Sequence, residues 1–197
     1  MLRFEKISGI GVRGLVGVSW SLFSLLWLAP GIFAKSARKR QTRGARFLQI
    51  AITAIAYWLI SGQFHSWPLL RLRLIPDAVW ADVCGWALLA AGFAFAFWAR
   101  ACLGGNWSSD VTIKKDHTLI LTGPYRFTRH PIYLGFLLAI LGTAVIFGRL
   151  SGFLGLLLAA VAWKIKSLQE ERFMLEEFGA AYRAYRSRVK GILPFIW

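Results

Sequence analysis

Cysteine is scarce in this chain, and its glycines do not follow a nucleotide-binding pattern. The 197 residues include two cysteines, Cys84 and Cys102, and neither has a Cys or His neighbour at the spacing of a metal-ligand pair. A disulfide framework and a zinc site are therefore not predicted, and no metal is expected. No glycine-rich strand–turn–helix fingerprint occurs either, so a Rossmann-type cofactor site is not supported.

Acidic residues are also few. Nine Asp and Glu stand against 24 Lys and Arg, which gives a formal net charge of +15. Such an excess is compatible with nucleic-acid binding, but 57% of the residues are hydrophobic, whereas soluble domains have about 45–50%. Basic residues at the borders of apolar segments have a simpler cause, because they keep loops on the cytoplasmic side of a membrane. The composition predicts an integral membrane protein without a nucleic-acid partner.

Five apolar segments approach the length needed to cross a bilayer, which is about 20 residues in a helix. The fifth is short by itself, but its helical pattern runs on to Phe178, and Gly179 is a candidate end or kink. Only Arg149 separates the last two segments, which predicts a tight helical hairpin. We expect a single all-α integral membrane domain over residues 1–197 with five transmembrane helices. The predicted spans are about 15–34, 47–64, 79–99, 132–148 and 150–166.

The distribution of Lys and Arg predicts the orientation of these spans. With the N-terminus outside, the inside segments 35–46, 100–131 and 164–197 hold 18 basic residues, and the outside segments hold six. Because positively charged loops stay in the cytoplasm, we expect an outer N-terminus and a cytoplasmic C-terminus. The basic residues of 35–46 are interpreted as a topology signal that also contacts lipid headgroups.

The segment 100–131 is longer than a loop that only connects two helices, which indicates a functional role. It ends in "TGPYRFTRHP". Pro131 suits the first turn of a helix. The free N–H groups and dipole of a helix start favour an anion, and Arg129 and His130 just before it add donors. The stretch is a candidate anion clamp, with contact to phospholipid phosphates as the alternative. Upstream, "HTLILT" has a β-like pattern without an apparent partner strand, so we expect an extended segment packed on helices.

The C-terminal helix carries two adjacent carboxylates, Glu170 and Glu171. Glu170 lies four residues beyond Lys166, so the two can pair along one face, whereas Glu171 lies four residues beyond Ser167 and finds no charge there. Taken alone, such a pair is typical of a solvated helix face. The predicted topology, however, puts it on the cytoplasmic side together with the clamp. A ligand with both a carboxylate and cationic or hydroxyl groups fits between them, and the amino-acid end and ribose of S-adenosylmethionine have this pattern.

Several motifs in this half of the chain together resemble a known family. They are "GNWS", "HTLILTGPYRFTRHPIYLG", "EERFMLEEFGAAYRAY" and the ending "GILPFIW". In order and spacing they are similar to the isoprenylcysteine carboxyl methyltransferases, which are related to the phospholipid N-methyltransferases. The resemblance covers roughly residues 98–197, the expected catalytic region. It implies an integral membrane enzyme that converts S-adenosylmethionine to S-adenosylhomocysteine in a cytosolic pocket formed by the 100–131 loop and the long C-terminal helix.

The resemblance also assigns site residues by position. Glu170 resembles the family's carboxylate, and Glu171 is its neighbour. The family's substrate-side arginine, four residues before that glutamate, is Lys166 here; it keeps the charge but not the planar fork. Lys166, Arg129 and Glu170 are the expected catalytic residues. The expected cofactor-binding residues are His117, Thr118, Leu119, Ile120, Tyr125, His130, Pro131, Ile132, Tyr133, Glu170 and Glu171.

Protonation chemistry favours one class of acceptor. A carboxylate is ionised at pH 7 and needs no base, whereas an amine must first lose a proton. The sequence offers no acid–base pair beside the clamp except Glu170 and Glu171, which favours O-methylation of a lipophilic, prenyl-cysteine-like carboxylate held by Lys166 or Arg129. Two alternatives stay open, namely N-methylation of a phospholipid amine and a non-catalytic membrane protein that binds lipid or a small anion.

Overall fold

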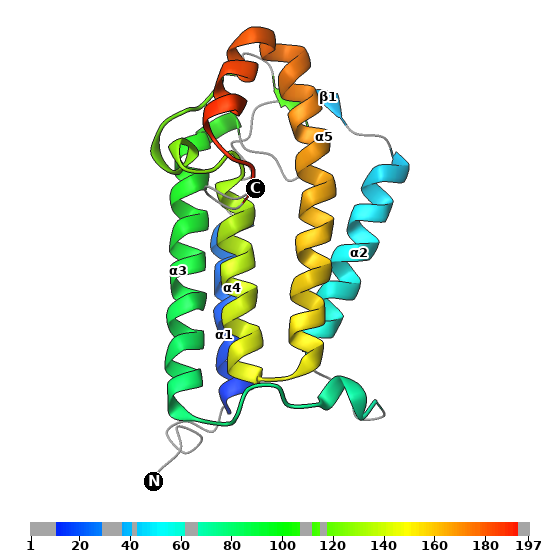
Figure 1. Cartoon of the computed structure of the whole chain (residues 1–197), viewed down its shortest axis with the longest axis vertical. Coiled ribbons are helices and arrows are strands. Elements are labelled where there is room, and N and C mark those ends of the chain that lie inside the picture. Colours follow the sequence, from blue (N-terminus) through cyan, green and yellow to red (C-terminus); the bar gives the residue numbers. More distant parts are fainter. Residues whose placement is uncertain are drawn as a thin grey trace. The chain divides into compact units, whose positions relative to one another are not determined.

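The computed structural model describes residues 11–28, 37–40, 43–61, 67–106, 112–114 and 118–192. The chain divides into two compact units, Met1–Phe33 and Ala34–Trp197. The first unit contributes one described helix, α1 (Val12–Leu28). The second unit contains four longer helices (Figure 1): α2 (Arg43–Ser61), α3 (Val79–Leu103), α4 (Pro131–Phe147) and α5 (Leu150–Arg188).

Short elements connect these helices. Three are 3₁₀ turns, η3 (Leu69–Arg71), η4 (Gly104–Asn106) and η5 (Gly123–Arg126). Two are strands, β1 (Ala37–Arg40) and β2 (Thr112–Lys114), which pair antiparallel. The sequence did not predict this ribbon, because each strand is too short to show a pattern and its partner is far away in the chain. Residues 118–121 of the β-like "HTLILT" belong to no helix or strand.

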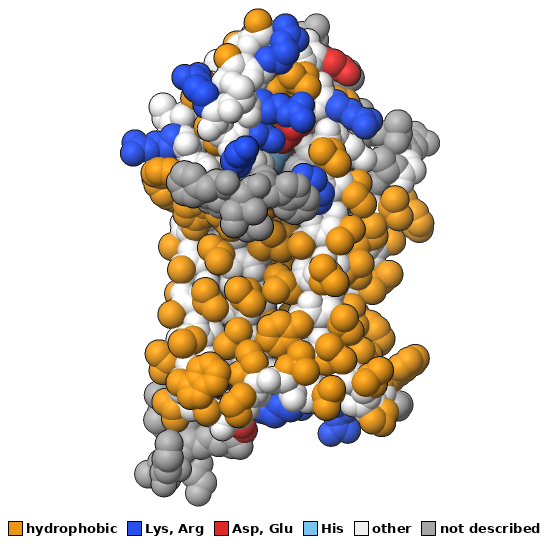
Figure 2. Space-filling model, in the orientation of Figure 1, with side chains coloured by type: hydrophobic (Ala, Val, Ile, Leu, Met, Phe, Trp, Pro, Cys, Tyr) orange, Lys and Arg blue, Asp and Glu red, His pale blue; other side chains and the backbone are white. Residues whose placement is uncertain are grey.

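The described parts of the five predicted apolar segments lie almost entirely on helices, and the exposed faces of these helices are strongly apolar. Residues 29–34 of the first segment and 62–64 of the second lie outside the described residues. In the described part of the chain, α3 and α5 have both the length and the hydropathy of a membrane span, and α1, α2 and α4 contain shorter apolar helices. Phe47 is 75% exposed, Tyr57 72% and Leu157 62%. Figure 2 shows hydrophobic side chains along the flanks of the helices and Lys and Arg gathered at the ends. Extended apolar surface of this kind is typical of contact with lipid.

Glycines let α3 and α4 lie side by side at very close range (Figure 1). A Cβ atom added at Gly92 would lie 2.4 Å from the backbone N of Ala139 and 2.5 Å from the carbonyl O of Gly135. One added at Gly142 would lie 2.5 Å from the carbonyl O of Gly85. Small residues of this kind allow helix backbones to approach where lipid offers no hydrophobic driving force. The first turn of α4 is thereby fixed against the C-terminal half of α3.

The predicted hairpin between the last two apolar segments is confirmed. Gly148 ends α4 in the left-handed conformation, with φ 64°, and its N–H donates to the carbonyl of Ala144. A preceding segment braces the turn, because the N–H of Leu74 donates to the carbonyl of Gly148 (2.8 Å) and that of Leu150 to the carbonyl of Leu72 (2.8 Å). This end of the bundle lies opposite the start of α4.

The fifth helix is long, as expected, and it bends. It packs against α2 and α4 and then continues beyond them (Figure 1). At Gly179 the backbone leaves the helical region, with φ 49° and ψ −116°, a conformation that favours glycine. After this kink the last turns of α5 come back toward the start of α4 (Figure 1). The predicted end or kink at Gly179 is a kink.

Candidate functional site

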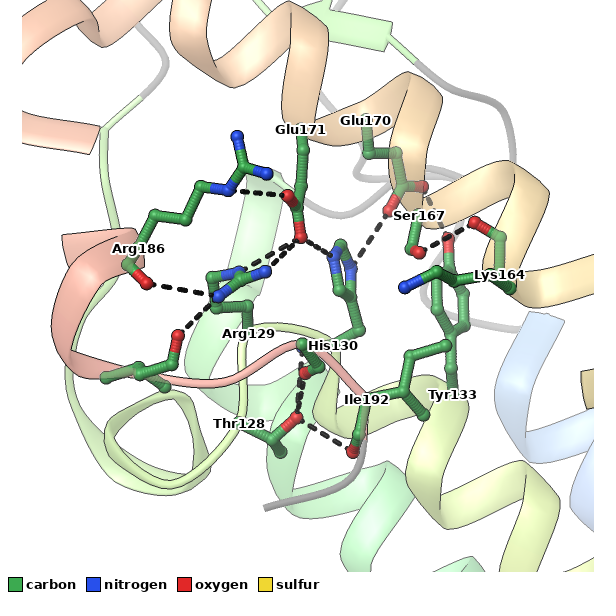
Figure 3. A network of polar contacts seen from close by, with 12 residues as sticks. Thr128, Arg129, His130, Tyr133, Lys164, Ser167, Glu170, Glu171, Arg186 and Ile192 are labelled. Carbon is green, nitrogen blue, oxygen red and sulfur yellow. Dashed lines mark hydrogen bonds and ion pairs between the residues drawn. The ribbon is translucent and has the colours of Figure 1, made fainter. Parts of the chain in front are cut away.

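The candidate site lies where the loop before α4 meets the middle of α5 (Figure 3). The loop residues come from the end of the 100–131 segment, and the carboxylates come from the part of α5 just before its kink. The returning end of α5 closes the third side. We call the following six residues the Glu170–Glu171 cluster: Arg129, His130, Tyr133, Glu170, Glu171 and Arg186.

His130 lies between the two carboxylates. Its Nε2 is 3.2 Å from Oε1 of Glu171, and its Nδ1 is 3.4 Å from Oε2 of Glu170. Both ring nitrogens can donate only when the imidazole is protonated. Burial alone would lower the pKa of His130, but hydrogen bonds and charge from both carboxylates outweigh it and raise the pKa above its usual value. The two carboxylates therefore favour the protonated form of the imidazole.

Glu171 is surrounded by cations. Arg129 donates to Oε1 from Nε (3.0 Å) and from Nη2 (2.7 Å), and Arg186 approaches Oε2 with its Nε at 3.3 Å. Although burial would raise the pKa of Glu171, the hydrogen bonds from His130 and Arg129 lower it to about 2. Glu171 is not part of a solvated face, because it is 5% exposed and its charge partners come from the loop before α4 and from the end of α5 beyond the kink.

Glu170 is the more open carboxylate, with a side chain that is 26% exposed. The hydroxyl of Tyr133 donates to its Oε1. Its pKa is lowered: burial opposes ionisation, but the hydrogen bond from His130 and the charge of Lys166 favour it more strongly. Lys166 also places its Nζ 5.5 Å from the centre of the Tyr133 ring. Glu170 is thus an ionised carboxylate that faces partly outward.

A stack of aromatic rings continues from His130 toward the apolar part of the bundle. The rings of His130 and Tyr133 are nearly parallel, with centroids 5.4 Å apart. The ring of Trp163 follows at 6.0 Å from Tyr133, and Phe136 packs against Trp163 at 5.5 Å. The cluster is therefore bordered on one side by an apolar wall of side chains from α4 and α5.

The helix start was predicted to offer free N–H groups to an anion, and the two N–H groups just before it are bonded to the chain itself. The N–H of Arg129 donates to the carbonyls of Lys190 and Gly191, and that of His130 donates to Gly191 at 3.2 Å. Because Pro131 has no N–H, the loop residues directly before α4 have no backbone donor left for an external anion, whereas the first turn of α4 itself is a separate set of donors. The cations next to it are also paired with Glu170 and Glu171, so the anion clamp holds internal carboxylates in this structure.

The other predicted cofactor residues are spread over three places. Pro131 and Ile132 open α4 directly beside the cluster. Tyr125 is buried in η5, and its carbonyl accepts a hydrogen bond of 2.6 Å from the hydroxyl of Tyr185. Residues 118–120 lie upstream of η5 and outside the cluster defined above. His117 lies outside the described residues.

The sequence profile of a family described as phospholipid methyltransferase matches residues 80–181. This segment contains α3, the connecting loop, α4 and most of α5, and with them five of the six cluster residues. The chain belongs to this family. The predicted kinship with the isoprenylcysteine and phospholipid methyltransferases is confirmed, and the predicted reaction class, methyl transfer, is confirmed at the level of the family.

Two relatives have names that specify different methyl acceptors. Methanethiol S-methyltransferase 2 of Bradyrhizobium diazoefficiens is 31% identical over 195 residues, covering 90% of this chain and 72% of the relative. Human protein-S-isoprenylcysteine O-methyltransferase is 28% identical over 155 residues, covering 76% of this chain and 52% of the relative. The chain thus spans about half the length of this human member of the family.

The fold itself is that of a solved family member. The structure of the eukaryotic intramembrane Ras methyltransferase ICMT superposes with a TM-score of 0.68 at 24% identity, over 98% of this chain and 70% of that one. The helical fold and the membrane setting predicted from the composition agree with this likeness.

Sequence reasoning missed residues that the tertiary fold brings to the site. Arg186 contacts Glu171 because the kink at Gly179 reverses the end of α5, and the glycine alone does not give the direction of the turn. Thr128 is uncharged and was not predicted as a site residue, yet it is fully buried and hydrogen-bonded to the C-terminal segment. The signal that could have pointed to Thr128 is its position directly before the predicted site residue Arg129, whereas Arg186 has no such neighbour in the sequence.

Proposed function

We propose that this chain is an integral membrane enzyme that transfers the methyl group of S-adenosylmethionine to the carboxylate of a lipophilic, prenyl-cysteine-like acceptor. The observation that carries the proposal is the ionised, partly exposed Glu170, held by Tyr133 and His130 at the start of α4. Its oxygens keep lone pairs for a cationic group from outside the chain. An ammonium group like that of the cofactor's amino-acid end suits this carboxylate.

S-Adenosylmethionine would supply an electrophilic methyl group at this place. Within the chain, Glu170 would bind the cofactor's ammonium group, and His130, Tyr133 and Glu171 would hold Glu170 and the helix start in position. The aromatic stack would exclude water on the membrane side, which strengthens electrostatic contacts. The remaining proposed cofactor-binding residues depend on the family resemblance: His117, Thr118, Leu119, Ile120, Tyr125, Pro131 and Ile132.

The charges of the cluster support a carboxylate acceptor. The pKa values of Glu170 and Glu171 are lowered, which makes these carboxylates weak bases, and that of His130 is raised, which favours the protonated form without a lone pair for a further proton. An amine acceptor would need a base, whereas a carboxylate needs only orientation. We propose that Lys166 binds the acceptor's carboxylate, because its Nζ lies beside the same aromatic wall.

Arg129 is proposed to act through Glu171. Its Nε and Nη2 donate to that carboxylate, and its Nη1 donates to the carbonyls of Arg186 and Val189 at the end of α5. A cation at a helix C-terminus also interacts favourably with the helix dipole. Contact between Arg129 and an acceptor carboxylate, as the sequence suggested, would require some of these bonds to break.

The proposed setting is a bilayer crossed by five helices, with an outer N-terminus and the cluster on the cytoplasmic side. The exposed apolar faces of α2, α3 and α5 support this arrangement. Within it, α4 and α5 present the aromatic wall at the level of the lipid, so a lipophilic acceptor could reach the cluster sideways.

A second candidate acceptor is a small thiol, because the relative from Bradyrhizobium that covers most of this chain is named a methanethiol S-methyltransferase. N-methylation of a phospholipid amine is a third candidate and is suggested by the family's description. It is disfavoured by the lack of a base in the cluster.

The direct test is methyl transfer by the purified protein in lipid nanodiscs. Labelled S-adenosylmethionine is supplied with a prenyl-cysteine analogue, phosphatidylethanolamine or methanethiol. We expect label in the prenyl-cysteine product that alkali releases as methanol, because esters hydrolyse and N-methyl groups do not. Base-stable label in lipid would assign N-methylation, and volatile labelled sulfide would assign the thiol. No transfer to any of the three would favour a non-catalytic protein.

Glu170→Gln tests the cofactor-binding role of this side chain. Removing one charged hydrogen-bond acceptor should weaken binding of S-adenosylmethionine about tenfold or more, measured by calorimetry in detergent. Glu177→Gln, an exposed position on the same helix, is the matched control and should bind as the wild type does. Equal affinity of both variants would rule out the assignment.

A further inference from the structure

The segment after α5 runs along the loop that carries Arg129 and His130 (Figure 3). We call residues 189–192 the C-terminal strap. The N–H groups of Arg129 and His130 both donate to the carbonyl of Gly191, at 3.0 and 3.2 Å. The loop supplies the donors and the strap supplies the acceptors in each of these bonds. The strap therefore satisfies backbone groups that would otherwise be left open beside the site.

Thr128 joins the strap to the loop through its side chain. Its hydroxyl lies within hydrogen-bond distance of the carbonyls of Gly191 and Ile192, the latter at 3.0 Å, and its single proton can be donated to either one. The same oxygen lies 3.4 Å from the backbone N of His130. Thr128 is fully buried and Ile192 is 3% exposed. Removal of this buried hydroxyl would leave the carbonyl of Ile192 without its side-chain donor, whereas that of Gly191 would keep the N–H groups of Arg129 and His130.

The guanidinium of Arg129 continues the connection to the carboxylates. Nη1 bonds to the strap carbonyl of Val189, while Nε and Nη2 bond to Glu171. A displacement of the strap would therefore move Arg129 and His130 together. Because these two side chains hold Glu170 and Glu171 from the other side, the carboxylates would lose their orientation as well.

We propose that Thr128 is a positioning residue for methyl transfer, whose buried hydroxyl ties the C-terminal strap to the loop that orients the Glu170–Glu171 cluster. The inference rests on the proposed function, and it adds residues that neither the motifs nor the family resemblance assign. Thr128 touches no reacting group. It acts through His130, and the strap acts through Arg129.

The test compares two isosteric Thr→Val exchanges in the full-length protein. Thr128→Val removes the hydroxyl at the strap. Thr143→Val makes the same change at another buried threonine, whose hydroxyl donates to the carbonyl of Ala139 within α4. Thr128→Ser keeps the hydroxyl. Methyl transfer is measured in nanodiscs at varied S-adenosylmethionine to separate KM from kcat.

We expect Thr128→Val to raise the KM for S-adenosylmethionine about fivefold or more, which corresponds to one buried hydrogen bond left unmade. Thr143→Val should keep the wild-type KM, and Thr128→Ser should restore most of it. In a His130→Gln background, Thr128→Val should add little, because the two residues act along one path. Equal KM values for Thr128→Val and Thr143→Val, or fully additive effects with His130→Gln, would overturn the proposal.

A measurement on the wild type covers the case in which Thr128→Val does not fold. Hydrogen exchange is followed with and without S-adenosylhomocysteine. We expect the ligand to slow exchange in peptides containing residues 125–135 and in those containing 185–192. Slowing confined to the first group would contradict the coupling. A wild type that transfers no methyl group refutes the proposed function instead, so the two failures are distinguishable.

Discussion

At the scale of single residues, the Glu170–Glu171 cluster is defined by the chain's own ion pairs. Arg129, His130 and Arg186 all contact Glu171, and its pKa falls to about 2. Two guanidinium groups and the imidazole of His130 face two carboxylates, and these carboxylates favour the protonated imidazole. Such a site stays ionised at neutral pH, and its task is to hold groups in place more than to exchange protons.

The pKa values give a stability prediction with a definite sign. A lowered pKa means that Glu171 stabilises the fold above its ordinary pKa of about 4.3 and that this contribution is lost as the pH falls toward 2. A raised pKa means that His130 contributes fully below about 6.5 and loses its contribution as the pH rises through the higher folded value. Stability from these two groups is therefore greatest between about pH 4.5 and 6.5.

Glu171→Gln tests the dependence of stability on pH at low pH. The variant should be less stable than the wild type at pH 6 by an amount on the order of 3 kcal/mol. The difference should shrink as the pH falls from 4.5 to 2, because the wild-type carboxylate becomes neutral too. Thermal unfolding in detergent across this range measures it. A difference that stays constant down to pH 2 would contradict the assigned pKa.

At the scale of secondary-structure elements, the contact of α3 with α4 depends on glycine pairs one heptad apart. The atoms nearest to an added Cβ at Gly92 are backbone atoms of Gly135 and Ala139. Backbone cannot rotate away as a side chain can, so a methyl group there must push the helices apart. The start of α4, and with it His130, would move with the helix.

Gly92→Ala should destabilise the protein, although alanine is the better helix former. Overpacking of this kind costs about 1–3 kcal/mol, which lowers the melting temperature by several degrees at roughly 2–4 °C per kcal/mol for a chain of this size. Gly44→Ala on α2, where an added Cβ meets nothing within 4 Å, is the matched control and should be neutral or stabilising. Equal melting temperatures for the two variants would show that α3 and α4 do not approach this closely.

The kink in α5 is the second structural feature at this scale that shapes the site. Gly179 lies in a positive-φ conformation within a helix that otherwise runs from Leu150 to Arg188. Helical periodicity on both sides of the glycine is intact, so the pattern predicts a long helix and a possible break. Only packing sets the direction of the break, and that direction brings Arg186 and the C-terminal strap to the cluster.

At the scale of the whole molecule, the proposed orientation follows from charge. The described Lys and Arg residues of the 67–78 and 148–150 segments number three, Arg71, Arg73 and Arg149, whereas the opposite end carries many more (Figure 2). Positive loops stay in the cytoplasm. The cluster would then open toward the compartment that contains S-adenosylmethionine.

Cysteine labelling in intact cells tests this orientation. After Cys84 and Cys102 are replaced by alanine, Arg71→Cys and Ser187→Cys are made one at a time at exposed positions. A membrane-impermeant maleimide should label the first variant in intact cells and the second only after permeabilisation. The reverse pattern would invert the proposed topology. Labelling of both variants after permeabilisation is the control for accessibility.

The sequence alone determined the features that depend on local pattern and composition. Apolar segments located the helices, Arg149 between two of them predicted the hairpin, and Gly179 marked the bend. The motif around Arg129 and His130 and the glutamates at 170 and 171 identified the family. The sequence predicts these properties because helix formation, chain reversal and membrane partition depend on neighbouring residues and on mean hydropathy.

How these segments meet depends on long-range packing. It paired β1 with β2, brought Arg186 to Glu171, and gave the N–H groups before α4 to the C-terminal strap instead of to an external anion. It also turned an apparent surface pair of glutamates into a buried ionic cluster. The physical reason is that burial and charge pairing are set by contacts between segments far apart in the chain, and no local pattern records the partner that each segment will find.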